Sequence, residues 1–376
     1  MYIKSQLTSG KKMNETIKVG VVGTSGFADL FHLPNLDSHP QATITTICGR
    51  NQERAKEIAD KYQIPLVFSD YQTMISEAEI EALVVITPDY LHYPITMSAI
   101  KANLHVYCEK PLSMTSRQAV EMWEAADQAK IKHMVGFGWR RIPIIEKMYE
   151  LVKNGYIGNC FEGHFHYRGG YGRSSEGSWK WNRNYGLGIL GDLGSHMIDM
   201  ARWMVGEVSQ VNAMLSNYVS RVEEDGSKQQ PNNDSAFLML KFENGAQVSI
   251  QVSAIADIGN RGQEQEFILH GSNGTLEYKF NMKDGYQLQG LQSGAEEFNQ
   301  IEIPTEIWEG IDRTQGILSE ITQLNQSRSI NTRRFIDAIR QDLKIEPSFY
   351  DGVKVQKIID AALQSDQKGE TINISD

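Results

Sequence analysis

The 376-residue sequence contains little cysteine, no excess of positive charge and no long apolar run. Its three cysteines, Cys48, Cys108 and Cys160, are odd in number and far apart, which argues against a disulfide framework and predicts a cytoplasmic location. The formal net charge of −10 argues against nucleic acid and anionic membranes as partners. No apolar run reaches about 18 residues, so no transmembrane helix is expected. The N-terminus also lacks the continuous apolar core of a signal peptide.

The length of the chain predicts two domains. Residues 1–16 are polar and without period, and we interpret them as an N-terminal arm in which Met13 is an alternative start. Over residues 17–140, short apolar runs alternate with helical segments, which predicts a dinucleotide-binding Rossmann domain with a doubly wound parallel sheet. The expected strands are 17–22, 43–48, 66–68, 82–86, 104–107 and 131–137, and the expected helices are 52–62, 93–102 and 116–130.

A glycine-containing turn, Gly23-Thr24-Ser25-Gly26-Phe27-Ala28, follows the first expected strand and precedes a helical segment. In that context glycines permit a tight turn and the close approach of a pyrophosphate, which the helix N-terminus binds through backbone amides. Because Ser25 replaces the middle glycine of the fingerprint, a purely structural turn is the alternative. We assign cofactor binding to Gly23, Ser25, Gly26, Phe27 and Ala28.

The second expected strand lacks the carboxylate that commonly binds the ribose hydroxyls and selects NAD. The sequence at its end is Cys48-Gly49-Arg50-Asn51, in which Arg50 can pair with a 2′-phosphate or stack on adenine. The sequence therefore favours NADP over NAD. A solvated residue at the start of the next helix is the alternative interpretation of Arg50.

Polar residues follow two further strands of this domain. Ligands bind beyond the carboxyl ends of the strands in such folds, so we expect Thr87 and Pro88 to flank the cofactor. His92 either contacts the cofactor or caps the next helix, and Glu109 either faces the cofactor or pairs with a neighbouring base. Lys110 lies between an apolar strand and a proline, which distinguishes it from an ordinary surface lysine, and we assign it with His92 and Glu109 to the cofactor site.

From residue 141 to residue 376 the pattern changes to that of an α+β domain with a large, open, mostly antiparallel sheet. The expected strands are 161–167, 208–218, 236–242, 246–254 and 266–270, and the expected helices are 144–154, 329–342 and 352–365. The dipeptide Asn244-Gly245 predicts a hairpin between two of these strands. One face of such a sheet stays uncovered by helices, which predicts a homodimer or homotetramer formed through that face.

The segment Gly188–Asp199 combines glycines with a carboxylate and an imidazole. Helical spacing places Asp192 and His196 on one face. Lys110 supplies an amine that can meet them. We therefore expect these three side chains to converge on a substrate beside a bound dinucleotide.

Aromatic residues upstream of this segment alternate with polar donors. Tyr171, Trp179 and Trp181 provide rings that suit the apolar face of a sugar, while the donors suit its hydroxyl rim. We assign these three residues to substrate binding, with a packed loop as the alternative.

Two histidines in the same region raise the question of a metal. His164 and His166 alternate on an expected strand, so both point to one face and could join His196 as ligands. No cysteine or second acidic cluster has ligand spacing. We therefore expect sheet histidines that are satisfied by hydrogen bonds, and no metal.

These motifs together resemble those of the Gfo/Idh/MocA family, the glucose–fructose oxidoreductase and inositol dehydrogenase group, from about Ile17 to the C-terminus. The resemblance implies a Rossmann domain followed by an α/β domain with an open sheet, a nicotinamide cofactor, and sugars, inositols or other polyols as substrates. It also implies that Lys110, Asp192 and His196 are the catalytic set, and we assign Arg141, with Asp192 and His196, to substrate binding. The matching residues are Gly20–Ala28, Thr87-Pro88 with His92, Glu109-Lys110-Pro111, Arg141 with Pro143, Gly191–His196 with Asp199, and Pro347-Ser348 through Asp351-Gly352 to Ala361.

The expected reaction is the reversible oxidation of a secondary alcohol. His196 takes the hydroxyl proton as general base, the substrate carbon passes a hydride to the nicotinamide, and Lys110 hydrogen-bonds the reacting oxygen. Asp192 orients His196 or binds a neighbouring hydroxyl. Two alternatives are a glycosidase that uses a bound nicotinamide in a redox-elimination cycle, and a non-catalytic sensor that binds the cofactor.

Overall fold

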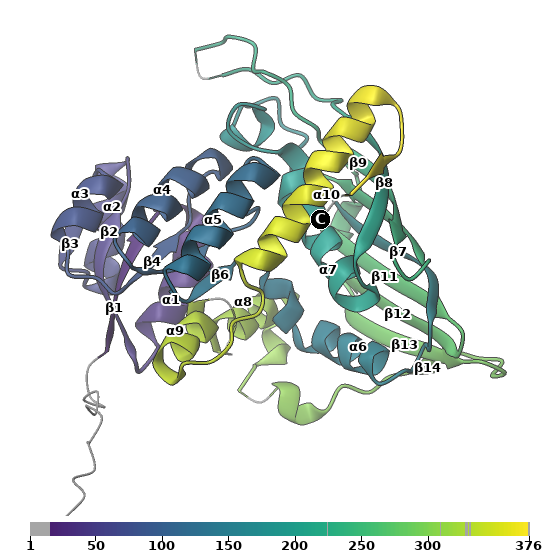
Figure 1. The fold of residues 1–376 in the computed structure, drawn as a ribbon. Helices are drawn as coiled ribbons and strands as arrows, with labels where there is room; N and C mark the ends of the chain where they lie inside the picture. Colours follow the sequence, from purple (N-terminus) through teal and green to yellow (C-terminus); the bar gives the residue numbers. More distant parts are fainter. Residues whose placement is uncertain (1–15, 224, 309, 328–329, 331, 375–376) are drawn as a thin grey trace, which may run out of the picture.

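The computed structural model describes residues 16–374 except residues 224, 309, 328–329 and 331 (Figure 1). Apart from Thr16, the arm expected at residues 1–16 lies outside this part of the chain. The described residues form two domains side by side, one around a parallel sheet and one around a larger sheet (Figure 1). Within them, no helix combines the length and the apolar character needed to cross a membrane.

The first domain is a six-stranded sheet in which all neighbouring strands are parallel. The order β3-β2-β1-β4-β5-β6 is that of a doubly wound dinucleotide-binding sheet, so the expected Rossmann domain is confirmed. The strand order reverses between β1 and β4, which are neighbours in the sheet. The loops after these two strands border the crevice where such folds bind ligands. The strands are β1 (Ile17–Val22), β2 (Ala42–Cys48), β3 (Leu66–Phe68), β4 (Ala82–Val85), β5 (His105–Cys108) and β6 (His133–Val135).

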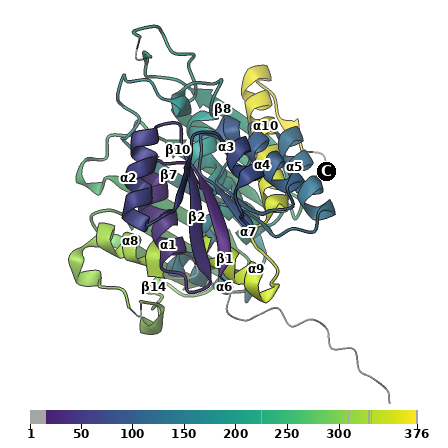
Figure 2. The ribbon, with the colours of Figure 1, turned by 90° about the vertical axis from the view of Figure 1, so that its left-hand side faces the viewer.

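Helices cover both faces of this sheet (Figure 2). Several begin where a short polar side chain accepts a backbone N–H: Asn51, Asp70 and Thr115 bind the amide three residues later. Such N-caps satisfy amides that the helix itself leaves unpaired. The helices are α1 (Leu33–Asp37), which follows a π-helical turn at Ala28–His32, α2 (Gln52–Tyr62), α3 (Tyr71–Glu77), α4 (Asp89–Lys101) and α5 (Ser116–Gln128).

A late segment of the chain completes the core of the first domain. Helices α8 (Ile317–Ser327) and α9 (Thr332–Gln341) both pack against α1. Phe335 and Ile336 of α9 are buried together with Val84 of the parallel sheet. Residues far beyond 141, where we placed the domain boundary, therefore contribute to the core of the first domain.

The second domain is a nine-stranded mixed sheet in the order β14-β13-β12-β11-β7-β10-β9-β8-β15. All neighbouring strands are antiparallel except β7 and β10, which confirms the mostly antiparallel sheet, and β9 and β10 flank Asn244-Gly245 as an antiparallel pair. The strands are β7 (Cys160–Gly169), β8 (Val208–Ser216), β9 (Ser235–Phe242), β10 (Gln247–Ser253), β11 (Gln263–Gly271), β12 (Gly274–Asn281), β13 (Gly285–Gln292), β14 (Asn299–Gln300) and β15 (Ile372–Asn373).

Three helices cover one face of this sheet: α6 (Pro143–Lys153), α7 (Ser195–Val205) and α10 (Phe349–Lys368). The last of these joins the two domains, because it packs against α5 and β6 of the first and against α7 and β8 of the second (Figure 1). Its approach is close, since a Cβ at Gly352 would lie 2.6 Å from the Leu112 side chain.

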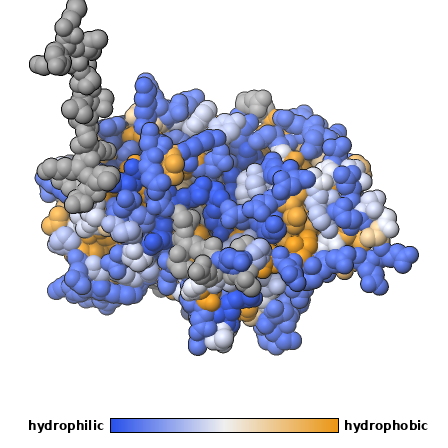
Figure 3. Space-filling model, turned by 90° about the horizontal axis from the view of Figure 1, so that it is seen from below, coloured by the Kyte–Doolittle hydropathy of each residue, from blue (hydrophilic) through white to orange (hydrophobic). Residues whose placement is uncertain are grey.

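The opposite face of the large sheet carries exposed apolar side chains. In β9 buried and exposed residues alternate, and Phe237 and Met239 are exposed together with Met214 of β8. Seen from below, the molecule is mostly hydrophilic, with hydrophobic side chains in separate clusters (Figure 3).

Candidate active site

Lys110 and Asp192 meet at the junction of the two domains. Lys110 follows β5 and precedes Pro111 in a cis peptide, and Asp192 lies in the π-helical segment Leu190–Gly194 that leads into α7. The Lys110 Nζ donates to the Asp192 carbonyl at 2.9 Å and to its Oδ1 at 3.0 Å. Burial lowers the pKa of Lys110, but Asp192 and Glu109 outweigh burial and raise it. The amine therefore stays an ammonium group that donates hydrogen bonds.

Asp192 also binds two side chains of the second domain. Its Oδ2 accepts from the Lys180 Nζ at 2.6 Å and from the Tyr171 hydroxyl at 2.6 Å. Burial raises the pKa of Asp192, but the two lysines outweigh it and hold that pKa far below its usual range. The sequence predicts Tyr171 as a site residue but not Lys180. The signal available for Lys180 was its position between Trp179 and Trp181.

His196 lies in the first turn of α7 and is 6% exposed. Its ring stacks on Trp139, with centroids 4.6 Å apart and planes 11° apart. Burial, reinforced by the charge of Lys110, lowers the pKa of His196 to about 3, so the imidazole is neutral. The His196 Nδ1 is buried and has no hydrogen-bond partner among the described residues. A neutral imidazole in this position can accept a proton from a substrate hydroxyl.

Glu109 belongs to a buried polar group next to Lys110. Its Oε1 accepts from the Tyr107 hydroxyl at 3.0 Å and lies 3.1 Å from the His32 Nε2. Burial raises the pKa of Glu109, but His32 and Lys110 outweigh it and lower the pKa to about 2. Gly136 leaves room for this carboxylate, because a Cβ there would lie 2.6 Å from the Glu109 Oε1. Of the two alternatives for Glu109, the structure shows the pairing with a base.

His92 is 1% exposed and connects the loops after β4 and β5. Its Nδ1 lies 2.7 Å from the Pro111 carbonyl oxygen and its Nε2 lies 2.8 Å from the Thr87 carbonyl oxygen. Since carbonyl oxygens only accept, both ring nitrogens donate when the ring is an imidazolium. Burial lowers the pKa of His92, but Cys108 and Asp89 outweigh it and raise the pKa to about 10. Both ring nitrogens are thus bound to the protein.

The glycine turn after β1 has room for a ligand. Gly23 has a φ of +126°, and a Cβ there would lie 2.0 Å from the Ile86 carbonyl oxygen, so only glycine fits. A Cβ at Gly26 would meet nothing within 4 Å. The Ser25 Oγ accepts from the Ala28 amide at 3.3 Å and closes the turn.

The other residues assigned to the cofactor lie near the same edge of the sheet. Phe27 and Arg50 are exposed, and Pro88 is the N-cap of α4. The Thr87 Oγ1 is buried and has no hydrogen-bond partner among the described residues. Together with the open space at Gly26, this hydroxyl fits the binding of a dinucleotide at the switch point of the sheet.

The remaining residues assigned to the substrate differ in their surroundings. Trp179 and Tyr171 are both exposed, by 37% and 43%. Trp181 is buried, with the Arg221 guanidinium 4.4 Å above its ring centroid. Arg141 donates to the Glu146 Oε1 at 2.6 Å, and the structure does not join it to the contact between Lys110 and Asp192.

The three histidines considered as metal ligands are not brought together. His164 and His166 lie on β7 beside Glu266 of β11, whereas His196 stacks on Trp139 in the site described above. Within the described part of the chain, the group with metal-ligand proximity is His164, His166 and Glu266.

The fold and this site define a dinucleotide-binding oxidoreductase. The model of the NAD-binding Rossmann fold of the Gfo/Idh/MocA oxidoreductase family matches residues 17–137. The model of the family's C-terminal alpha/beta domain matches residues 149–374. The chain therefore belongs to this family, and the resemblance noted in its motifs is confirmed.

Relatives within the family are similar over most of the chain. Levoglucosan dehydrogenase of Pseudarthrobacter phenanthrenivorans is 29% identical over 355 residues, which cover 87% of this chain and 88% of that protein. The NADP⁺-dependent scyllo-inositol 2-dehydrogenase IolW of Bacillus subtilis is 25% identical, over 97% of this chain and 98% of that protein. The solved structure of levoglucosan dehydrogenase with NADH and levoglucosan has a TM-score of 0.85 at 27% identity, and the match covers 96% of this chain and all of that one.

Proposed function

We propose that this chain is an NAD(P)-dependent dehydrogenase that transfers a hydride between a secondary alcohol of a sugar, inositol or related polyol and the nicotinamide. The observation that carries the proposal is the contact of the Lys110 ammonium with Asp192, four residues before the buried His196 ring, whose Nδ1 has no hydrogen-bond partner among the described residues. Relatives that are similar over most of the chain are named as dehydrogenases of an anhydrosugar and of an inositol, which supports this substrate class.

The charge states assign different roles to the three side chains. His196 accepts the proton of the substrate hydroxyl, because it is neutral while Lys110 is already protonated. Lys110 donates a hydrogen bond to the same oxygen and stabilises its developing negative charge. Asp192 fixes the direction of the Lys110 ammonium through its carboxylate and its carbonyl. A nicotinamide cofactor, which the turn Gly23–Ala28 and Thr87 would hold, would supply the acceptor for the hydride of the carbinol carbon.

The absorbance of the reduced nicotinamide tests this proposal. The purified protein is mixed with NAD⁺ or NADP⁺ and a panel of inositols, aldoses, anhydrosugars and glycosides. We expect Lys110→Ala and His196→Ala each to lower turnover about 10²-fold or more while cofactor affinity is retained. His270→Ala, on β11 outside the site, serves as the matched control. Normal turnover in both site variants contradicts the assignment, and release of sugar from glycosides without net absorbance favours the glycosidase cycle.

We also infer that the protein prefers NADP to NAD, and the same assay tests this preference. The position after β2 is Gly49 and carries no acid that could select NAD, and a side chain there would require Thr24 to shift, since a Cβ would lie 2.5 Å from the Thr24 side chain. Arg50, next in the chain, is exposed and can pair with a 2′-phosphate. Arg50→Ala is expected to lower kcat/KM for NADP⁺ about 10-fold and to leave that for NAD⁺ unchanged. An equal effect on both cofactors contradicts this preference.

We also infer that the uncovered face of the large sheet joins copies of the chain into a homodimer or homotetramer. The exposed apolar side chains of Met214, Phe237 and Met239 on that face support this. A monomer by light scattering contradicts it.

A further inference from the structure

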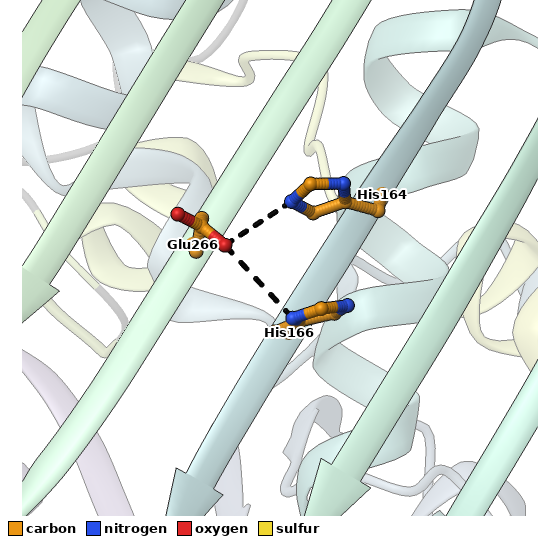
Figure 4. Close-up of side chains that lie close together, drawn as sticks. All are labelled: His164, His166 and Glu266. Atoms are coloured by element: carbon orange, nitrogen blue, oxygen red, sulfur yellow. Dashed lines mark hydrogen bonds and ion pairs between the residues drawn. The ribbon is translucent and has the colours of Figure 1, made fainter.

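Two imidazoles and a carboxylate lie together on the large sheet, outside the candidate active site. His164 and His166 are two residues apart on β7, so they point to one face, while Phe165 and Tyr167 point into the core. The antiparallel register of β11 places Glu266 opposite His166. Figure 4 shows one nitrogen of each ring joined by a dashed line to the same Glu266 carboxylate oxygen.

The distances between these groups are close to those of a metal site. The His164 Nε2 lies 3.2 Å and the His166 Nδ1 lies 3.9 Å from the Glu266 Oε2. The three ligand atoms lie within 4.8 Å of one another. An ion that binds nitrogen and oxygen at about 2.0–2.2 Å needs ligand atoms roughly 3–3.5 Å apart. The His164–Glu266 separation already lies in this range, and side-chain rotations of about 1 Å would bring the His166 Nδ1 into it.

We propose that His164, His166 and Glu266 bind one divalent transition-metal ion of the zinc class. Imidazole nitrogen and carboxylate oxygen are the ligands that such ions prefer, and three protein ligands leave a coordination position for water or a ligand from another molecule. The site also accounts for an otherwise unexplained atom: the His166 Nδ1 is buried and has no hydrogen-bond partner among the described residues.

A lysine on the neighbouring strand forms an ion pair with the Glu266 carboxylate. The Lys279 Nζ of β12 lies 3.4 Å from the Glu266 Oε1, the oxygen that faces away from the histidines, and 3.3 Å from Glu277. Its positive charge opposes a nearby cation. Removal of this charge, in Lys279→Gln, should therefore tighten metal binding, which is the opposite of what loss of a ligand does.

Calorimetric titration of the chelator-treated, dialysed protein with ZnCl₂ tests the proposal. We expect one Zn²⁺ per chain, at least about 10-fold weaker binding in His164→Asn and in Glu266→Gln, and several-fold tighter binding in Lys279→Gln. His270→Asn is the matched control, because this histidine of β11 hydrogen-bonds Thr275 and not the site. With Co²⁺ as a second probe, wild-type protein should show a visible d–d spectrum that Glu266→Gln alters.

Variants that are expected to fold allow the titration to contradict the proposed metal site. Glu266→Gln changes one atom type at a partly exposed position, so it reports on the site even where a histidine variant fails to fold. The proposal is overturned if the wild type binds no Zn²⁺, or if Glu266→Gln and Lys279→Gln bind it as the wild type does. It is equally overturned if Cys160→Ser, on the same strand, abolishes binding that His164→Asn leaves intact.

Discussion

Gly26 is the residue whose substitution best separates ligand binding from folding. It lies at the start of the first helix, where alanine has the higher helix propensity, and a Cβ there would meet nothing within 4 Å of the protein. Gly26→Ala is therefore expected to leave the free energy of unfolding within about 0.5 kcal/mol of the wild-type value. The added methyl would stand where the pyrophosphate approaches the turn, so we expect the Kd for NADPH to rise about 10-fold or more.

Urea denaturation and NADPH fluorescence measure the two effects separately. Gly23→Ala is the contrasting variant: its Cβ would lie 2.0 Å from the Ile86 carbonyl oxygen, so it should destabilise the domain. A Gly26→Ala protein that binds NADPH as tightly as the wild type would remove the turn from the cofactor site.

At the scale of single residues, motifs with fixed spacing were predictable from the sequence and loop contacts were not. Lys110 and Asp192 each belong to a short motif, and the structure places them in contact, although their catalytic roles stay a prediction. Lys180 binds the same carboxylate, but it lies in an irregular segment without period, so no spacing rule connects it to Asp192. Glu266 lies beside His164 and His166 because the register of β7 and β11 places it opposite His166, and the sequence does not reveal that register.

Among the elements, the loops after β4 and β5 are held together by one imidazole. His92 binds the carbonyl oxygens of Thr87 and Pro111, and the second of these loops carries Lys110. A His92→Gln side chain cannot reach both carbonyls, so at least one buried acceptor loses its partner at a cost of about 1–3 kcal/mol. We expect the free energy of unfolding to fall by that amount and kcat to fall about 10-fold, because Lys110 is no longer held in place.

His39→Gln provides the comparison for this variant. His39 is also a buried histidine of the first domain, paired with Asp337 at 3.1 Å and remote in sequence from Lys110. Its replacement should lower stability in urea and leave kcat unchanged. Equal losses of kcat in both variants would show that His92 acts only through stability.

The elements themselves were predictable in proportion to their periodicity. The strands and helices of the Rossmann domain were expected within a few residues of their bounds, apart from α3, because alternating buried strands and amphipathic helices leave a clear pattern. In contrast, β12 and β13 were not expected, even though Leu276, Tyr278 and Phe280 alternate with polar residues in β12. The return of α9 to the first domain could not be read from sequence, because its apolar stripe does not specify which surface it covers.

For the molecule as a whole, α10 is the element that ties the two domains together, and its start depends on a histidine. The Phe349 amide at the first turn of α10 donates to the His133 Nδ1 at 3.1 Å, and this nitrogen can accept only while the ring is neutral. Burial, opposed by Asp127 and Asp351 and reinforced by Lys132, lowers the pKa of His133 to about 4. Folding therefore disfavours the protonated ring.

The consequence is an acid sensitivity of the whole fold. Unfolded His133 has a pKa near 6.5, so as the pH falls from about 6.5 to about 4 the unfolded state binds a proton that the folded state does not. The free energy of unfolding then falls by up to about 1.4 kcal/mol per pH unit, or roughly 2 kcal/mol between pH 7 and pH 5.

In His133→Asn the amide oxygen can replace the Nδ1 as acceptor without titrating. Because His166, His196 and Asp89 also titrate here with shifted pKa values, the difference between wild type and variant isolates His133. Urea denaturation at pH 5, 6, 7 and 8 should show the wild type losing stability more steeply than His133→Asn, and parallel curves would contradict the role of this histidine.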